Sequence, residues 1–212
     1  MTYVRPELEL GIYLDEFGVP IPYGRRWGMG SPPEVTYSVC AHPERFAPVY
    51  PVAQALVDHL IDAYDVDVSD TARLPGWLEA AEIGSESYPV SITRLTPKDP
   101  EAAPLSFVEL ASPGVVVMAG AAARATFPQC GCDACDTDVV ELIETMENQV
   151  FAVVAGEFQE RLTRLKVYET WRGQDWSHAG WMPRRHAERD DVTALIRARR
   201  HLGAQWQPWP TR

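Results

Sequence analysis

The hydrophobic residues of this chain change their spacing twice, and this change limits the fold more than any other feature. Between residues 46 and 64 they recur every three or four positions, as on one buried face of an α-helix. Over residues 88–127 they alternate with their neighbours or form short runs, which is typical of β-strands. Helical spacing returns over residues 139–158. We therefore expect a group of strands between two helices, in an α+β fold.

The strands are expected to be short and antiparallel. Residues 88–93 and 105–110 alternate in character, and residues 115–127 predict one or two further strands. Turn-forming Pro and Gly residues separate these runs, and no helical pattern lies between them. Residues 165–182 predict one more hairpin. The predicted fold is an antiparallel sheet of about four to six strands packed by two long helices, with an N-terminal arm and a C-terminal helix.

Several local signals indicate where elements begin and end. Residues 34–40 alternate and predict a short strand, whereas residues 65–81 are expected to form a loop or a helical turn. Pro51 suits the first turn of a helix, where its missing N–H costs nothing. Asp138 followed by Glu141 has the spacing of a capping box, so the second helix is expected to begin there.

The two ends of the chain differ from its middle. The first 34 residues are rich in Pro, Gly and aromatic residues, which favours an ordered arm held on the core by its rings. The rings expected to anchor it are Tyr13, Phe17, Tyr23 and Trp27. Residues 188–202 combine helical spacing with arginines and predict a basic helix. The predicted division is an arm (1–34), a single α+β domain (35–183) and a basic helix with its tail (184–212).

Charge is distributed unevenly along the chain. Of the 212 residues, those at positions 1–159 include 8 basic and 24 acidic side chains, whereas positions 160–212 include 11 basic and 6 acidic ones. The resulting net charges are −16 and +5. An acidic body repels phosphate backbones, so nucleic-acid binding is not expected. The acidic surface favours a basic protein partner, although solubility alone also explains it.

The N-terminus lacks the basic and apolar regions of a signal peptide, and no apolar run approaches the length of a membrane span. We therefore expect a cytoplasmic protein without membrane segments. In a reducing cytosol, its four cysteines are expected to be free or bound to a metal rather than paired.

Three of these cysteines form a C-x-C-x-x-C run directly before the second predicted helix. Cys132 and Cys135 have the two-residue gap that lets both sulfurs reach one ion, and Cys130 can join them through the turn at Gly131. A zinc site would need a fourth ligand from elsewhere. The candidates are Cys40, His42, His178, His186 or an acidic neighbour.

Three interpretations of the cysteine run are open. The first is a structural zinc site, and the second is a redox or sensing cluster that can close a disulfide between Cys132 and Cys135. The third is simply reduced cysteines packed where a strand meets a helix. Nearby aspartates raise the pKa of a thiol, whereas a helix N-terminus lowers it, and the sequence does not decide between these effects.

No complete catalytic motif accompanies this run. The chain has no G-x-S-x-G, H-E-x-x-H, P-loop or G-x-G-x-x-G sequence, and no pair of carboxylates stands out as a general acid and base. The leading hypothesis is therefore a non-enzymatic domain that binds a partner and holds a structural zinc. The alternative is a redox or sensor protein, or an enzyme, that uses Cys130, Cys132 and Cys135.

Three segments stand out together: residues 42–48 (HPERFAP), residues 76–82 (GWLEAAE) with residues 91–97 (SITRLTP), and residues 127–136 (FPQCGCDACD). With these segments the chain resembles a family of uncharacterised bacterial proteins, a domain of unknown function. The resemblance spans roughly residues 35–182 and implies one intact domain, but it implies no activity, cofactor or catalytic residue.

Overall fold

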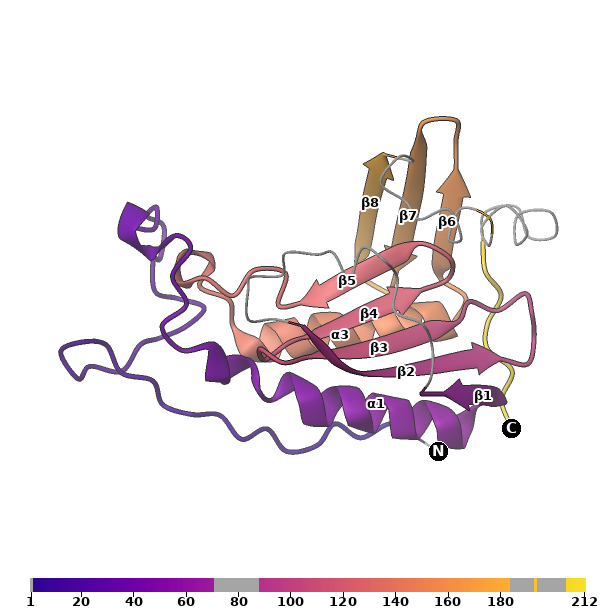
Figure 1. Ribbon diagram of the computed structural model, residues 1–212, viewed down its shortest axis with the longest axis horizontal. Helices are drawn as coiled ribbons and strands as arrows, with labels where there is room; N and C mark the ends of the chain where they lie inside the picture. The colour runs from indigo at the N-terminus through magenta and orange to yellow at the C-terminus, as the bar shows by residue number, and fades with distance from the viewer. Residues whose placement is uncertain (1, 71–87, 184–192, 194–204) are drawn as a thin grey trace.

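Two α-helices form where helical spacing predicted them. The computed structural model describes residues 2–70, 88–183, 193 and 205–212. Helix α1 is Val49–Ala63 and helix α3 is Val139–Val154. The helices contact each other and pack against one face of a five-stranded sheet (Figure 1). Their apolar stripes therefore meet the sheet, as the sequence predicted.

The five-stranded sheet is an antiparallel meander with its strands in chain order. Its strands are β1 (Val66–Ser69), β2 (Pro89–Pro97), β3 (Leu105–Leu110), β4 (Val115–Ala119) and β5 (Ala123–Phe127). The expected antiparallel pairing is confirmed for β2 to β5. Strand β1 was not predicted, because four residues are too few to show a period of two. It pairs with the end of β2.

A second, three-stranded sheet follows α3, whereas the sequence predicted a single sheet. It consists of β6 (Phe158–Leu162), β7 (Lys166–Arg172) and β8 (Ser177–Pro183), and it rises from one end of the first sheet (Figure 1). The predicted hairpin of β7 and β8 is confirmed. The prediction that Phe158 continues the second helix is wrong. Gly156 adopts a left-handed conformation with φ of 72°, which ends the helix and lets β6 begin.

The strand predicted over residues 34–40 does not form. A single 3-10 turn, η1 (Glu34–Thr36), takes its place, and the Thr36 hydroxyl donates to the carbonyl oxygen of Pro33 at 2.5 Å. The alternating residues Val35, Tyr37 and Val39 are exposed. Alternation predicts a strand only where the apolar face can be buried, and here the face that carries these three residues is left exposed, whereas Thr36 is buried.

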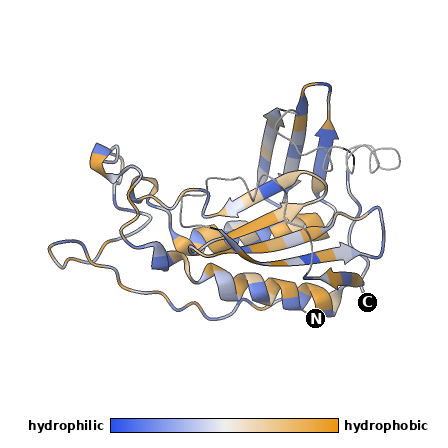
Figure 2. Cartoon of the chain, viewed as in Figure 1, coloured by the Kyte–Doolittle hydropathy of each residue, from blue (hydrophilic) through white to orange (hydrophobic). Residues whose placement is uncertain are grey.

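The main core lies between the first sheet and the two helices. It extends to the C-terminal segment, where Trp206 and Trp209 are buried and the Trp209 indole donates to the carbonyl oxygen of Ala103 at 2.8 Å. Figure 2 shows that hydrophobic residues dominate β3 and β4 and alternate with hydrophilic ones along α1. A smaller apolar cluster around Val108 and Val116 lies on the opposite face of the sheet.

A buried carboxylate joins the two sheets. Glu160 on β6 is 1% exposed and lies against the turn between β4 and β5. Its two oxygens accept hydrogen bonds of 2.8 to 3.0 Å from the backbone N–H groups of Ala121, Ala122 and Ala123 and from the indole of Trp206. The same side chain therefore holds the second sheet and the C-terminal segment on the first sheet.

The N-terminal arm contacts the rest of the molecule at both of its ends. The Tyr3 hydroxyl donates to Glu147 of α3 at 2.7 Å, and the Arg5 guanidinium pairs with the same carboxylate. Further along, the Trp27 indole donates to the carbonyl oxygen of Asp133 at 3.2 Å. Tyr3 and Leu8 also pack against the main core.

Phe17 does not anchor the arm, so that prediction is wrong. Its side chain is 80% exposed, because a local turn carries it into solvent. The Asp15 carboxylate closes this turn by accepting the N–H groups of Phe17 and Val19. The division into arm, domain and tail stays a prediction. The predicted C-terminal helix lies outside the described residues except for Thr193, which is helical. Where the chain is described, none of its helices has the length and apolarity needed to cross a membrane.

Candidate metal centre

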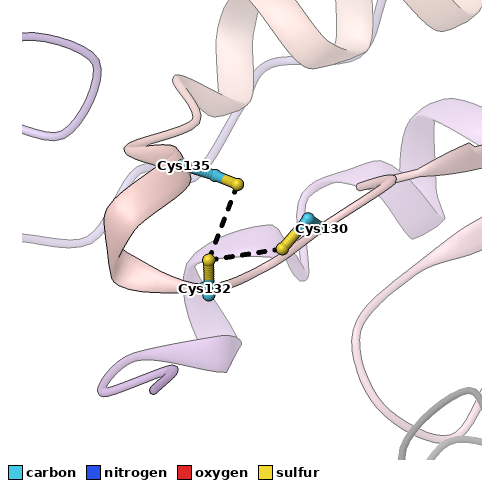
Figure 3. Close-up of side chains that lie close together, drawn as sticks. All are labelled: Cys130, Cys132 and Cys135. Atoms are coloured by element: carbon cyan, nitrogen blue, oxygen red, sulfur yellow. Dashed lines mark hydrogen bonds between the residues drawn. The ribbon is translucent and has the colours of Figure 1, made fainter. Parts of the chain in front are cut away.

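The three cysteines of the C-x-C-x-x-C run turn their sulfurs toward one another (Figure 3). The Sγ atoms of Cys130 and Cys132 are 3.3 Å apart, and those of Cys132 and Cys135 are 3.5 Å apart. All three sulfurs lie within 4.8 Å of one another. Cys130 and Cys135 are exposed and Cys132 is partly exposed, so a metal ion or an oxidant can reach them.

The three cysteines lie in the segment that joins β5 to α3, residues 128–138, here called the cysteine loop. A short 3-10 turn, η3 (Asp133–Cys135), brings Cys135 close to Cys132, and the N–H of Cys135 donates to the carbonyl oxygen of Cys132. Asp138 then caps α3 by accepting the backbone N–H groups of Val140 and Glu141, at 2.7 and 3.2 Å. The predicted N-cap is confirmed, and it anchors one end of the loop.

Arg45 holds the other side of the loop. It lies in the 3-10 turn η2 (Pro43–Phe46) and is 3% exposed. Its guanidinium donates to the carbonyl oxygens of Gly131 and His42 at 3.0 and 3.1 Å, and it lies 4.1 Å from the ring centroid of Tyr23. One arginine therefore connects the cysteine loop, the segment before α1 and the arm.

Asp133 completes this attachment from within the loop. The side chain is 5% exposed, and its carboxylate lies 3.6 Å from Arg26 and 3.7 Å from Arg45. It also accepts the N–H of Ala41 at 3.3 Å, while the Asp133 N–H donates to the carbonyl oxygen of Val39 at 2.7 Å. This aspartate is thus paired with arginines and amides.

Two unusual backbone conformations flank the sulfurs. Apart from glycines, the only described residues with positive φ are Ser38, at 59°, and Asp136, at 48°. The N–H of Ser38 donates to the Cys132 sulfur, and the Asp136 carboxylate accepts the N–H of Arg26 at 2.6 Å. Strained conformations of this kind gather at functional sites, where surrounding contacts hold them in place.

The environment gives the thiols different proton affinities. Burial raises the pKa of Cys132, but hydrogen bonds from Cys130, Cys135 and Ser38 outweigh burial and lower this pKa to about 7. Burial and the neighbouring cysteines raise the pKa of Cys135 to about 12. The cluster therefore favours one thiolate at Cys132, stabilised by N–H and S–H donors.

Cys40, the cysteine candidate for a fourth ligand, lies close to the loop but outside the group. Its sulfur is near Gly131 and accepts a long hydrogen bond of 3.7 Å from Arg45. Among the described residues, the set of potential ligand atoms that lie this close together contains only the three loop cysteines.

The histidine candidates have other surroundings. The two ring nitrogens of His42 lie 3.0 Å from the Glu44 carboxylate and 3.1 Å from the carbonyl oxygen of Leu14. His178 lines a cleft together with Cys135 but does not belong to the close group. His186 lies outside the described residues.

The sulfur spacing fits a shared soft metal ion. Zinc–sulfur bonds of about 2.3 Å at tetrahedral angles place two sulfurs about 3.8 Å apart. The observed separations of 3.3 and 3.5 Å differ from this value by about 0.5 Å or less. A disulfide would require about 2.05 Å, so the three thiols are unpaired.

The roles of Arg45 and Asp133 in holding the loop were not predicted from the sequence. The available signal was that both lie in segments that carry the family resemblance, residues 42–48 and 127–136. Their contact joins two distant parts of the chain, so it could not be inferred from spacing.

Comparisons with other proteins place the chain in a family without assigning it a function. No curated protein and no solved structure matches the sequence. A family model described as "Family of unknown function (DUF6226)" matches residues 11–212. This match confirms the resemblance at the level of the family, over a longer stretch than the sequence suggested. The chain therefore belongs to the DUF6226 family, a family of unknown function.

Proposed function

We propose that Cys130, Cys132 and Cys135 bind one zinc ion with a structural role in a non-enzymatic, partner-binding domain. The observation that carries this proposal is the convergence of the three sulfurs within 4.8 Å. Soft thiolates select zinc among the common divalent ions. The N–H groups directed at Cys132 favour the thiolate that a metal requires.

The place of the cluster supports a structural role. The cysteine loop touches the arm through Trp27, the segment before α1 through Arg45, and α3 through the cap at Asp138. A short loop with many polar contacts and few apolar ones gains much from an ion that crosslinks its three thiols. Zinc would therefore stabilise the junction of three segments that are far apart in sequence.

The fourth coordination position has two candidate occupants. Cys40 is close enough to Gly131 to reach the site after a side-chain movement, since its weak contact with Arg45 is easily exchanged. A water molecule is the alternative and would leave the ion open on one side.

Metal analysis of protein purified without chelator tests the proposal. We expect one zinc per chain, lost in Cys132→Ser and accompanied by a lower melting temperature. Cys40→Ser distinguishes the two candidates for the fourth position. Retention of zinc in this variant assigns the fourth position to water, whereas loss assigns it to Cys40. Metal-free protein whose melting temperature is unchanged by added zinc would contradict the proposal.

A thiol-redox function is the second candidate. It is favoured by the exposure of Cys130 and Cys135 and by sulfur separations that a small movement would close to a disulfide. Two thiols would lose two electrons and two protons to a disulfide or peroxide oxidant. Mass spectrometry after mild oxidation should then find a Cys130–Cys132 or Cys132–Cys135 disulfide. If added zinc prevents this oxidation, the metal role is favoured.

The proposed partner is a basic protein. The support is the charge of −16 over residues 1–159, together with exposed carboxylates such as those of Glu44, Asp67 and Glu144. Affinity for such a partner should fall steeply as salt is added, because exposed charges are screened. Affinity that is indifferent to salt would contradict an electrostatic interface.

A further inference from the structure

A polar cleft lies beside the cysteine loop, between α3, β5 and the β7–β8 hairpin. Its volume is about 680 Å³, which is within the range of small-molecule sites. Residues Arg124, Gln149, Glu169 and His178 line it from four different elements. Cys135 is one of its lining residues, together with Gln129 and residues 136–138 of the same loop, so the cleft adjoins the candidate metal centre, while most of its lining comes from other elements.

Gln149 has a buried amide oxygen without a partner. The side chain lines the cleft from α3 and is 7% exposed. Its Oε1 accepts no hydrogen bond from any described residue. Buried polar atoms are nearly always bonded, because an unsatisfied one costs free energy in the folded state. Gln149 therefore brings to the cleft lining an enclosed acceptor that no described donor satisfies, and a rotation of its side chain would present this oxygen to a ligand.

Glu169 adds a half-buried carboxylate to the lining of the cleft. It lies on β7, directly across from Glu160 on β6. Burial and the nearby Glu160 raise its pKa to about 7, while Arg124 lowers it. A second like charge at this position is unfavourable, and Arg124 supplies one positive charge beside it.

The charges around the cleft favour a cationic ligand over an anionic one. Its lining contains four carboxylates and only two basic side chains, Arg124 and His178. The N-terminus of α3 would ordinarily attract an anion, but the Asp138 carboxylate already caps it. Two of the carboxylates, Glu141 and Glu169, belong to facing elements.

We propose that this cleft binds a terminal guanidinium or amine, with Gln149 Oε1 accepting one N–H and the Glu169 carboxylate balancing the charge. Exposed Glu141 supplies further negative charge at the cleft border. The group has two sources, a free small molecule or an arginine or lysine side chain of a basic partner. The assignment does not depend on zinc, because no cysteine sulfur is required to hold the cation.

Calorimetric titration of the full chain tests the site. The probes are agmatine, a blocked tripeptide with a central arginine, and glutarate as an anion of similar length. We expect agmatine to bind with one molecule per chain and glutarate not to bind. Binding of the peptide without agmatine assigns the cleft to a protein partner. If neither cation binds at millimolar concentration, or if glutarate binds as well as agmatine, the proposal is overturned.

Two variants separate ligand binding from folding. Gln149→Met keeps the side-chain shape and removes the unpaired oxygen, so it should weaken agmatine binding at least tenfold without lowering the melting temperature. Glu169→Gln removes the charge and should weaken binding similarly. Glu144→Gln is the matched control, because this exposed carboxylate on α3 lies outside the cleft lining. Unchanged affinity in Gln149→Met, or an equal loss in Glu144→Gln, would contradict the assignment.

The metal centre is tested separately by Cys132→Ser. This variant should lose zinc but keep its affinity for agmatine, since Cys132 does not line the cleft. If Cys132→Ser loses both zinc and its affinity for agmatine, the cleft depends on the cysteine loop. The proposal of an independent site is then overturned.

Discussion

Both sheets of this protein bury apolar side chains, but the second sheet also buries a carboxylate, that of Glu160. The face of the first sheet that meets the helices buries hydrocarbon, including Leu95, Phe107 and Val117. The second sheet places Glu160 between Phe158 and Leu162 on the buried side of β6. Burial of hydrocarbon needs only a matching apolar surface, whereas burial of a carboxylate needs donors at defined positions.

The two kinds of burial contribute differently: apolar packing mainly stabilises the fold, whereas the buried carboxylate mainly determines how its parts dock. Apolar packing of α1 and α3 on the first sheet supplies a driving force that is not directional. The Glu160 carboxylate instead requires the turn between β4 and β5 and the indole of Trp206, so it selects one way of docking the second sheet and the C-terminal segment. Glu169 lies beside it on a sheet that also lines a polar cleft.

Glu160→Ala should cause the largest fall in the free energy of unfolding, and it tests the contribution of the buried carboxylate. Three backbone N–H groups and one indole N–H would lose their acceptor, and each unsatisfied donor costs about 1 to 3 kcal/mol. We expect the free energy of unfolding to fall by about 5 kcal/mol. Urea denaturation measures this loss, and hydrogen exchange at Trp206 should increase. Glu157→Ala, at an exposed position, is the control; a loss as small as in this variant would contradict the role of Glu160.

Leu56→Ala tests the apolar side of the comparison. Leu56 lies on α1 and is fully buried against the first sheet. Its truncation should lower the free energy of unfolding by about 3 kcal/mol through lost burial and a cavity. Because no titratable group is involved, the loss should be the same at pH 5 and pH 8. A strongly pH-dependent loss would mean that the two regions are coupled.

Glu169→Gln should have an effect no larger than that of Leu56→Ala, and the effect should depend on pH. The folded-state pKa of Glu169 is raised to about 7 by burial and by Glu160, with Arg124 opposing. Protonation therefore stabilises the fold below the unfolded pKa of about 4.5, and this contribution is lost as pH rises through about 7. The glutamine variant should match the natural protein at pH 5 and be more stable at pH 8, by at most about 3 kcal/mol. Parallel pH profiles of thermal unfolding would contradict the raised pKa.

The elements whose structure depends only on residues close together in the sequence were largely predictable. The stripe of α1, the cap at Asp138 and the hairpin of β7 and β8 follow from spacing within one segment. The proximity of Cys130, Cys132 and Cys135 also follows, because a C-x-C-x-x-C run brings its sulfurs together through one turn. The wrong predictions concern segments whose structure depends on contacts with distant parts of the chain. Gly156 and the C-terminal segment ended α3 before Phe158, and no surface covered the face formed by Val35, Tyr37 and Val39.

The amino-acid sequence by itself determined the helices, most strands, the acidic body and the cluster of three thiols. Only the tertiary structure decided that Arg45 and Asp133 hold the cysteine loop, that Glu160 joins two sheets, and that Gln149 and Glu169 face one cleft. The reason is physical. Hydrophobic spacing is a property of one element, whereas the donors and acceptors of a buried polar group come from elements that meet only after the chain has folded.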